Sequence, residues 1–227
     1  MDKSAGIVGL GVLGSAITQY LLEQDWKIHG YDISANALNQ LQKFKAFKPC
    51  TSPADVINNQ EITLLCLPSA ASLEIVMKDL PGNSLPHSKQ PLLIELSTLP
   101  EDSKIAALKI AQDNNIRMVD SPVSGNRIVA LNGKLSAYLS GIRQDTEIAK
   151  PLLDAFCHKV TEVGDFGNGS KMKLIGNILN LVHNSVTAEV MVLGMKVGLE
   201  PELIHKAISG TFSSSAVFEG RGKLMVD

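Results

Sequence analysis

The chain has 227 residues, of which 44% are hydrophobic and 19% are charged, and its formal net charge is −2. This balance is ordinary for a soluble globular protein, and the length is enough for a sizeable core in one large or two small domains. The charges are spread along the chain without a long basic run, so we expect no nucleic-acid partner.

The first thirty-two residues are the most informative part of the chain. An apolar strand is predicted over Ser4–Gly9, and it leads into Gly9-Leu10-Gly11-Val12-Leu13-Gly14. A helix is predicted over Val12–Glu23, followed by a second strand, Lys27–Tyr31, with Asp32 at its end. The glycine pattern alone is weak evidence. Its combination with a strand, a helix and a later acid is the layout of a dinucleotide-binding site.

Each residue of this layout has an expected role. Gly9 permits a tight turn, Gly11 lets the backbone approach a pyrophosphate, and Gly14 allows close contact between helix and strand. The N-terminus of the helix attracts the phosphates. Asp32 is able to accept hydrogen bonds from ribose hydroxyls and would repel a 2′-phosphate, which favours NAD over NADP; a solvated turn aspartate is the alternative.

Strands and helices continue to alternate up to about residue 163. Further strands are predicted at Ile62–Cys66, Leu92–Leu96, Ile116–Val119, Ser136–Leu139 and Lys159–Val163. Capping residues and prolines predict helices at Ala35–Lys43, Ala54–Asn59 and Ser103–Asn114. This alternation is typical of the α/β class, with a doubly wound, mostly parallel sheet. Pro81–Pro91 is predicted to be a surface loop.

The composition changes after a glycine cluster that begins at Gly164. One long apolar helix is predicted over Ser170–Gly198 and a second helix over Pro201–Ser209, without further strand signals. We therefore predict a Rossmann-type dinucleotide-binding domain over residues 1–164 and an all-helical domain over residues 165–227. The long helix would join the two domains.

Several features bear on the cellular compartment. The longest uncharged stretch, Leu174–Ala188, is predicted to be too short and too polar to span a bilayer. The N-terminus enters a strand within a few residues and lacks the pattern of a secretory signal. Cys50, Cys66 and Cys157 are isolated, as in a reducing compartment. We expect a cytoplasmic protein without a membrane partner or a metal site.

Three segments follow predicted strands and are placed to border a ligand crevice, which lies outside the carboxyl ends of the strands in such folds. They are Leu67-Pro68-Ser69, Ser97-Thr98 and Asp120–Gly125. In the third segment, the Ser124 hydroxyl and the Gly125 N–H are suited to hold a carboxylate. Taken singly, each segment also fits an ordinary turn or strand cap.

Lys173 and Asn177 are four residues apart and would project from one face of the long helix. Lys171 would lie on the opposite side. The apolar residues beside Lys173 favour its partial burial, which lowers the pKa of a lysine and allows proton transfer near neutral pH. A solvated surface charge is the commoner role of a lysine near a helix start.

Together these elements resemble the β-hydroxyacid dehydrogenase family, which includes 3-hydroxyisobutyrate dehydrogenase and the glyoxylate, succinic-semialdehyde and tartronate-semialdehyde reductases. The resemblance covers essentially the whole chain. In chain order it rests on Gly9–Gly14, Leu67-Pro68-Ser69, Ser97-Thr98, Asp120–Gly125, Gly167-x-Gly169-x-x-x-Lys173-x-x-x-Asn177 and Gly198-Leu199-Glu200-Pro201. It implies a Rossmann domain, a long interdomain helix and an all-helical domain.

The resemblance also implies an activity and the residues that carry it. The chain would be an NAD(P)-dependent oxidoreductase that interconverts a small 3-hydroxy acid and its semialdehyde by hydride transfer. Lys173 would act as general acid/base, and Asn177 would orient substrate and lysine. Ser124 and Gly125 would bind the substrate carboxylate. The nicotinamide side would be lined by Pro68 and Thr98.

Two departures from the family pattern affect these expectations. Asn126 stands where the family usually has a second glycine. Family members usually continue beyond the position of Asp227 with helices that carry a Lys-Asp motif, so either the sequence is a piece of a longer protein or the helical domain is shortened. An NAD-binding scaffold without catalysis is therefore the alternative function. An imine reductase would share the fold, but those enzymes usually have another residue at the position of Lys173.

The long helix bears on assembly as well. Residues Lys171–Gly198 carry more apolar surface than a single sheet is able to cover. Exposed apolar surface of this extent favours self-association, and closed twofold symmetry is the commonest arrangement. We therefore expect a homodimer or a higher homo-oligomer.

Overall fold

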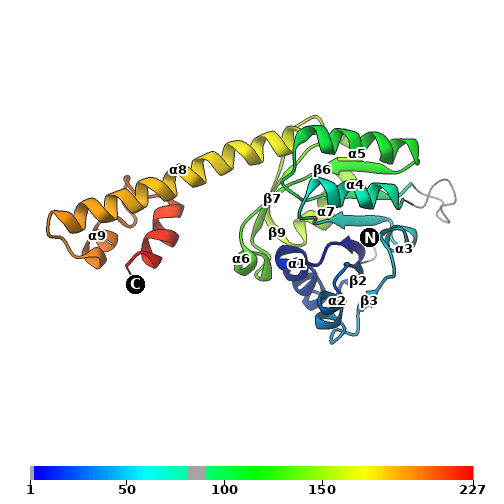
Figure 1. Cartoon of the computed structure of the whole chain (residues 1–227), viewed down its shortest axis with the longest axis horizontal. Helices are drawn as coiled ribbons and strands as arrows, with labels where there is room; N and C mark the ends of the chain where they lie inside the picture. The colour runs from blue at the N-terminus through cyan, green and yellow to red at the C-terminus, as the bar shows by residue number, and fades with distance from the viewer. Residues whose placement is uncertain (1–2, 81–89, 227) are drawn as a thin grey trace. The chain divides into compact units, whose positions relative to one another are not determined.

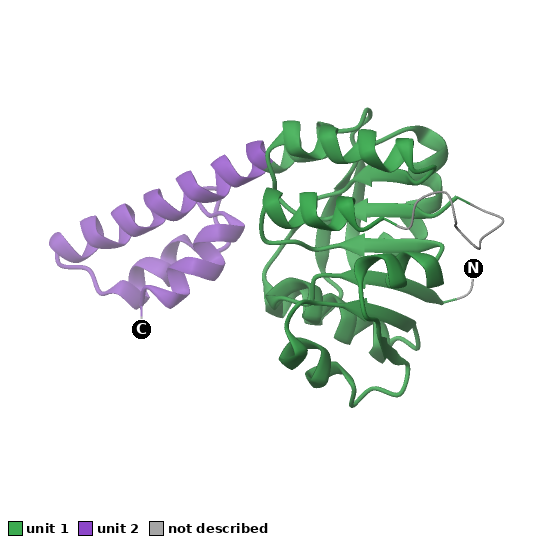
Figure 2. Ribbon diagram, turned by 45° about the vertical axis from the view of Figure 1, so that its right-hand side comes forward, with its two compact units in different colours: residues 1–173 green, residues 174–227 purple. Residues whose placement is uncertain are grey.

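The computed structural model describes residues 3–80 and 90–226 (Figure 1). Most of the predicted Pro81–Pro91 loop therefore lies outside the described residues. The chain forms two compact units, residues 1–173 and residues 174–227 (Figure 2). This division falls after the predicted domain boundary at residue 164, because the first turns of the long helix pack with the first unit.

A parallel sheet is the centre of the first unit. Among the described residues it has six strands in the order β3-β2-β1-β4-β5-β6, which confirms the predicted doubly wound sheet. The strands are β1 (Ser4–Val8), β2 (Lys27–Tyr31), β3 (Phe47–Pro49), β4 (Ile62–Leu65), β5 (Leu92–Glu95) and β6 (Arg117–Asp120). The winding reverses between β1 and β4, and ligands of such sheets bind outside the carboxyl ends at this point.

Helices cover both faces of this sheet because the strand side chains alternate between two cores. In β5, Leu92 and Ile94 join one core, whereas Leu93 joins the other. Buried side chains of α1 and α7 belong to the first core, and those of α3, α4 and α5 belong to the second. The helices are α1 (Val12–Glu23), α2 (Ala35–Leu41), α3 (Pro53–Asn59), α4 (Ala70–Lys78), α5 (Glu101–Asp113) and α7 (Arg143–Asp154).

The last two predicted strands of the first domain do not join the main sheet. They correspond to β8 (Leu135–Leu139) and β9 (Cys157–Glu162), which form a separate three-stranded sheet with β7 (Val123–Ser124). The chain leaves the main sheet at Pro122, which has no N–H for a strand ladder, and β7 then pairs antiparallel with β8. A short helix, α6 (Arg127–Leu131), lies between β7 and β8 in the chain. Five elements, β3, β7, α4, α6 and α7, were not predicted from the sequence.

The long helix α8 runs over Asn168–Lys196 and confirms the prediction of one continuous apolar helix. By length and composition alone it is able to cross a membrane. The sequence analysis considered only its uncharged part and judged that part too short. The first unit holds the start of α8 by hydrogen bonds that are described below.

The second unit contains the rest of α8, helix α9 (Pro201–Ile208) and a π-helical turn, η1 (Phe218–Gly222). Its small core consists of Met191, Ile204 and Phe218. Many large apolar side chains of α8 in this unit are half or more exposed, among them Leu174, Ile175, Ile178, Leu179, Leu181, Val182 and Leu193.

Candidate functional site

The glycine turn after β1 has the geometry that the sequence predicts. Gly9 adopts a φ of +96°, and a Cβ there would lie 2.2 Å from the carbonyl oxygen of Cys66. A Cβ on Gly14 would lie 2.0 Å from the carbonyl oxygen of Gly9, so α1 packs against the turn without room for a side chain. The backbone of the protein itself therefore requires both glycines.

Gly11 differs from Gly9 and Gly14 because nothing in the protein requires it. A Cβ on Gly11 would have no heavy atom within 4 Å, and the φ of −64° suits any residue. In the described part of the chain, no side chain accepts a hydrogen bond from the N–H of Val12 or Leu13 at the start of α1. Open space beside a free helix N-terminus fits a phosphate that contacts the backbone.

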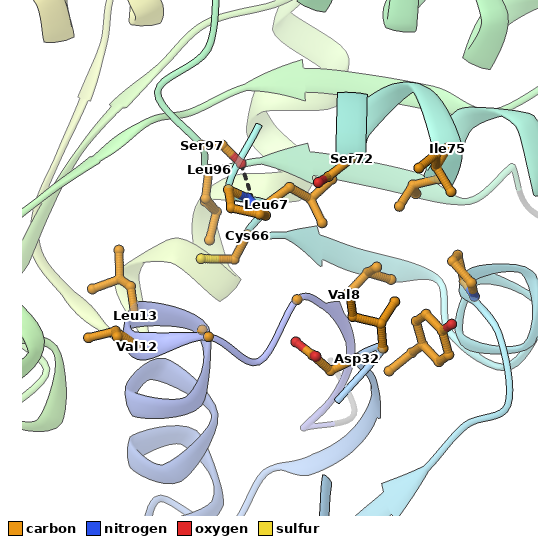
Figure 3. Close-up of a pocket in the computed structure, with 18 of the residues that line it drawn as sticks. Val8, Val12, Leu13, Asp32, Cys66, Leu67, Ser72, Ile75, Leu96 and Ser97 are labelled. Carbon is orange, nitrogen blue, oxygen red and sulfur yellow. Dashed lines mark hydrogen bonds between the residues drawn. The ribbon is translucent and has the colours of Figure 1, made fainter. Parts of the chain in front are cut away.

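Asp32 lies at the end of β2 and holds the glycine turn in place (Figure 3). One carboxylate oxygen accepts a hydrogen bond of 2.7 Å from the N–H of Leu10, and the other accepts one of 2.7 Å from the N–H of Ser34. Each carboxylate oxygen has two acceptor sites, so both retain capacity for a further donor. Asp32 is therefore suited to receive a ribose hydroxyl.

These residues line a cavity of about 700 Å³ within the first unit (Figure 3). That volume is typical of a small-molecule site. Of the predicted cofactor residues, the lining includes Gly9, Gly11, Val12, Leu13, Gly14, Asp32, Leu67, Pro68 and Thr98. The lining also includes residues that the sequence did not predict for the site. Three of them, Ser72, Ile75 and Val76, lie on the unpredicted helix α4, and others among them are Tyr31, Ile33, Ser52, Pro53 and Asp79. Among the described residues, the lining includes two carboxylates, those of Asp32 and Asp79, and neither lysine nor arginine.

Two predicted cofactor residues do not line this cavity. Leu10 contributes its N–H to Asp32, while its side chain is buried in the core. Ser69 caps α4, and its hydroxyl accepts a hydrogen bond of 3.1 Å from the N–H of Ser72. The structure thus gives both residues a role in shaping the cavity wall.

The predicted carboxylate-binding turn, Ser124 and Gly125, directly follows a residue that lines the cavity. Val123 lines the cavity, and Ser124 follows it at the end of β7 with a half-buried side chain. Gly125 is exposed and has a φ of +139°. Asn126, at the position of the missing second glycine, caps α6 by accepting a hydrogen bond of 3.0 Å from the N–H of Val129. The residue that departs from the family pattern, Asn126, therefore serves as the N-cap of α6.

Lys173 and Asn177 lie one turn apart on α8, as the spacing predicts. Neither lines the cavity, and Asn177 belongs to the second unit. Lys173 is half-buried at the end of the first unit, and desolvation by burial lowers the pKa of its ammonium group. Lys171 instead forms an ion pair of 3.0 Å with Glu101 at the start of α5. The two lysines therefore have the different environments that the sequence analysis expects.

A buried charge cluster, Glu95–Lys104–Asp120, is the main feature that the sequence analysis missed. All three side chains are fully buried. The Lys104 ammonium lies 2.5 Å from Oε2 of Glu95 and 2.7 Å from Oδ1 of Asp120. Burial raises the pKa of Glu95, although the Lys104 ammonium opposes this shift. Glu95 in the otherwise apolar run Leu92–Leu96 was the available signal, because a buried acid needs a partner.

Comparison with known proteins gives matches along both parts of the chain. Residues 4–164 match the family described as the NAD binding domain of 6-phosphogluconate dehydrogenase. Residues 167–227 match the family described as "NAD-binding of NADP-dependent 3-hydroxyisobutyrate dehydrogenase". The two matches meet in the glycine cluster before α8.

Individual relatives are similar over nearly the whole chain. L-threonate dehydrogenase of Cupriavidus necator is 29% identical over 97% of this chain and 74% of its own length. The 3-sulfolactaldehyde reductase of Escherichia coli is 29% identical over 93% of this chain and 70% of its own length. The crystal structure of 3-hydroxyisobutyrate dehydrogenase from Salmonella typhimurium superimposes with a TM-score of 0.83 at 26% identity, covering 99% of this chain and 78% of that one. By sequence and by fold, this chain belongs to the β-hydroxyacid dehydrogenase family of NAD(P)-dependent oxidoreductases.

Proposed function

We propose that this enzyme reduces a small semialdehyde or oxo acid that carries a carboxylate, and oxidises the corresponding 3-hydroxy acid, with Lys173 as general acid/base. The nicotinamide cofactor supplies or accepts the hydride when it is bound. The glycine turn and the N-terminus of α1 would hold its pyrophosphate, Asp32 its ribose, and Pro68 and Thr98 its nicotinamide side. The vacant space at Gly11 supports this fit.

In this proposal the remaining site residues bind and orient the substrate. The Ser124 hydroxyl and the Gly125 N–H would donate hydrogen bonds to the carboxylate. Asn177 would orient the substrate and the lysine from the next turn of α8. The Lys173 ammonium would donate a proton to the carbonyl oxygen during reduction, and its neutral amine would take that proton during oxidation.

The observation that carries this assignment is the partial burial of Lys173 in the first turns of α8. Burial lowers its pKa, which suits proton exchange nearer to neutral pH. The thiol of Cys66, which lines the cavity, is a poor alternative because burial raises its pKa to about 12. It stays protonated under ordinary conditions.

Turnover and cofactor binding of Lys173→Ala, measured side by side, test the assignment. We expect turnover with NADH to fall by several orders of magnitude, while the Kd for NADH stays within about twofold. Lys171→Ala is the matched control, because Lys171 is a lysine of the same helix in an exposed ion pair, and its turnover should be unchanged. Substantial activity in Lys173→Ala would refute the role of Lys173.

The substrate is to be identified with a panel of small carboxylates. The panel contains glyoxylate, succinic semialdehyde, tartronate semialdehyde and 3-hydroxyisobutyrate. The names of the relatives add L-threonate and 3-sulfolactaldehyde.

We also propose that the enzyme prefers NAD to NADP. The cavity lining contains the carboxylates of Asp32 and Asp79, and Ile33 is 94% exposed beside Asp32. Within the described ranges 3–80 and 90–226, no lining residue is a cation that would pair with a 2′-phosphate. Asp32→Ser combined with Ile33→Arg should raise kcat/KM for NADPH relative to NADH by at least about tenfold. An unchanged ratio would remove this argument.

The exposed apolar face of α8 supports the proposal of a homodimer. Leu174, Ile178 and Leu181 are 55%, 61% and 71% exposed in the single chain. A soluble protein rarely leaves such a contiguous surface open to water. Sedimentation velocity of the purified chain should give the mass of a dimer, and Leu181→Glu should shift it toward the monomer. A wild-type monomer at all concentrations would contradict the proposal.

We further propose a cytoplasmic location. Cys50, Cys66 and Cys157 are all free thiols, as in proteins of a reducing compartment. Cell fractionation tests this proposal, which requires the protein in the soluble fraction without detergent. Recovery with the membranes would contradict the proposed location.

A further inference from the structure

The buried charge cluster is the least expected part of the first unit. Glu95 and Asp120 face one ammonium, that of Lys104, and all three side chains are fully shielded from water. Removing such charges from water is costly, and apolar residues of similar volume often stabilise a core equally well. A requirement for stability alone therefore does not account for the cluster.

One arm of the cluster reaches the start of α8. Oδ2 of Asp120 accepts a hydrogen bond of 2.8 Å from the N–H of Ser170, and Oδ1 accepts one of 3.0 Å from the Ser170 hydroxyl. Ser140 extends this arm, because its hydroxyl accepts a hydrogen bond of 3.0 Å from the N–H of Gly169. A carboxylate at a helix N-terminus is favoured by the exposed N–H groups and the helix dipole. Asp120 thus caps α8 from strand β6.

The close packing of Gly169 fixes the same point. A Cβ on Gly169 would lie 2.4 Å from the carbonyl oxygen of Tyr138 and 3.0 Å from Oδ2 of Asp120. The helix therefore begins in direct contact with β8 and with the carboxylate. Lys173 follows Ser170 by three residues, less than one turn further along the same helix. The direction in which Lys173 projects depends on this anchor.

The other arm reaches the wall of the cavity. The Lys104 ammonium donates a hydrogen bond of 2.6 Å to the carbonyl oxygen of Ser97, and Oε1 of Glu95 accepts one of 3.0 Å from the N–H of Ser97. The Ser97 hydroxyl in turn accepts one of 2.8 Å from the N–H of Leu67, the contact that is dashed in Figure 3. Ser97 and Leu67 both line the cavity. One buried ammonium therefore connects the cavity wall with the start of α8.

From these contacts we propose that Glu95, Lys104 and Asp120 are positioning residues, which fix Lys173 relative to the cavity wall at Leu67, Ser97 and Thr98. The inference rests on the proposed role of Lys173 as general acid/base. Proton and hydride transfer both require reacting atoms within a few tenths of an ångström of their productive positions. A rigid ionic link between the two parts of the site meets that need.

Asp120→Asn is the variant that tests this inference. The substitution leaves Lys104 and Glu95 as a one-to-one pair and keeps an oxygen at the cap, while it weakens the hold on α8. The matched control is Asp145→Asn. Asp145 is also a buried carboxylate of this unit, and it pairs with Arg117 at the opposite end of the same strand β6. Ser170→Ala is a milder second variant, which removes only the hydroxyl contact with Asp120.

The first readout requires no turnover. Lysines of the full chain are labelled by reductive ¹³C-methylation and titrated by NMR, with the Lys173 signal assigned as the one absent from Lys173→Arg. In the wild type, Lys173 should titrate below the exposed lysines. In Asp120→Asn, and by a smaller step in Ser170→Ala, its titration should move toward theirs, because a displaced α8 exposes the amine. Asp145→Asn should leave it unchanged.

Steady-state kinetics are the second readout. Asp120→Asn should lower kcat by about tenfold to a hundredfold while the KM for NADH stays within about twofold. If Asp120→Asn does not fold, Ser170→Ala alone decides the result. A Lys173 titration and a kcat equal to those of the wild type in the folded variants would overturn the inference. Full activity of Lys173→Ala would instead refute the proposed function itself, so the two failures are distinguishable.

Discussion

Two helices of this molecule, α1 and α8, each have at their N-terminus a pair of glycines with one residue between them, Gly9 and Gly11 before α1 and Gly167 and Gly169 at the start of α8. Their N-termini are built in opposite ways. At Gly11, ahead of α1, an added Cβ would meet nothing, and the first N–H groups are open to the cavity. At Gly169, in α8, an added Cβ would meet the carbonyl oxygen of Tyr138, and Asp120 and Ser140 cap the N–H groups. Two helices with similar local sequences thus differ at their N-termini. The start of α1 is accessible to an external anion, whereas the start of α8 is capped by the carboxylate of Asp120.

The largest effect is expected from a variant that removes the cation of the Glu95–Lys104–Asp120 cluster. Lys104→Met would leave two buried carboxylates without their cation and should lower the free energy of unfolding by about 3–5 kcal/mol. Urea unfolding followed by circular dichroism gives this value. The triple variant with Glu95→Gln and Asp120→Asn added should recover part of the loss, since it removes the unpaired charges. A Lys104→Met protein as stable as the wild type would show that the ammonium does not balance the cluster.

A smaller effect is expected when the close packing at the start of α8 is disturbed. In Gly169→Ala the new methyl group would push against backbone, which does not yield as a side chain does. We expect a loss of about 2 kcal/mol in the free energy of unfolding, the usual cost of overpacking. The same urea experiment measures it, and wild-type stability would mean that the helix start is free to shift.

Gly11→Ala tests the start of α1, where we expect an external phosphate to bind. The protein has room for the methyl group, so the free energy of unfolding should stay within about 0.5 kcal/mol of the wild type. A bound pyrophosphate would lose its approach to the backbone, and the Kd for NADH should rise about tenfold, or ~1.4 kcal/mol. Fluorescence titration with NADH measures the Kd. An unchanged Kd would place the phosphates elsewhere.

The smallest expected effect is a shift in the pH dependence of kcat/KM. Reduction requires protonated Lys173, so its kcat/KM should fall as pH rises through the lowered pKa of this residue. Oxidation requires the neutral amine, so its kcat/KM should rise over the same interval. Both limbs should lie below the ordinary pKa of a lysine. Initial rates of both reactions, measured from about pH 6 to about pH 11, give the two pH profiles. The fall of the reduction profile and the rise of the oxidation profile should occur over the same pH interval. Profiles that change over different intervals would contradict the assignment.

The sequence was sufficient for the features that depend on local backbone geometry. Gly9 and Gly14 stand where a tight turn and a close helix contact require them, and nearly all-apolar strands such as β5 indicate a sheet covered by helices on both faces. The spacing of Lys173 and Asn177 needed only the helical repeat. These predictions follow from neighbouring residues and from the layout of a known family, so the fold class and nine of the residues that line the cavity were accessible.

The parts that were missed depend on contacts between residues far apart in the chain. Asp120 caps a helix that begins some fifty residues later, with Ser170 as its partner, and no local pattern indicates this pairing. Lys104 lies on a helix with many polar residues, where a solvated charge is the ordinary expectation. The strand pattern at 136–139 was recognised, but its placement in a second sheet depends on its pairing with β7.

The three glycines of the turn are subject to two kinds of evolutionary constraint. Folding requires Gly9 and Gly14, whereas only the bound nucleotide would require Gly11. Substitutions at Gly9 and Gly14 are removed by selection in any descendant that still folds, whether or not it keeps its chemistry. A substitution at Gly11 is removed only while the nucleotide matters to the cell. Among divergent copies of this gene, drift at Gly11 beside intact Gly9 and Gly14 would therefore mark lineages that have kept the scaffold and abandoned the cofactor.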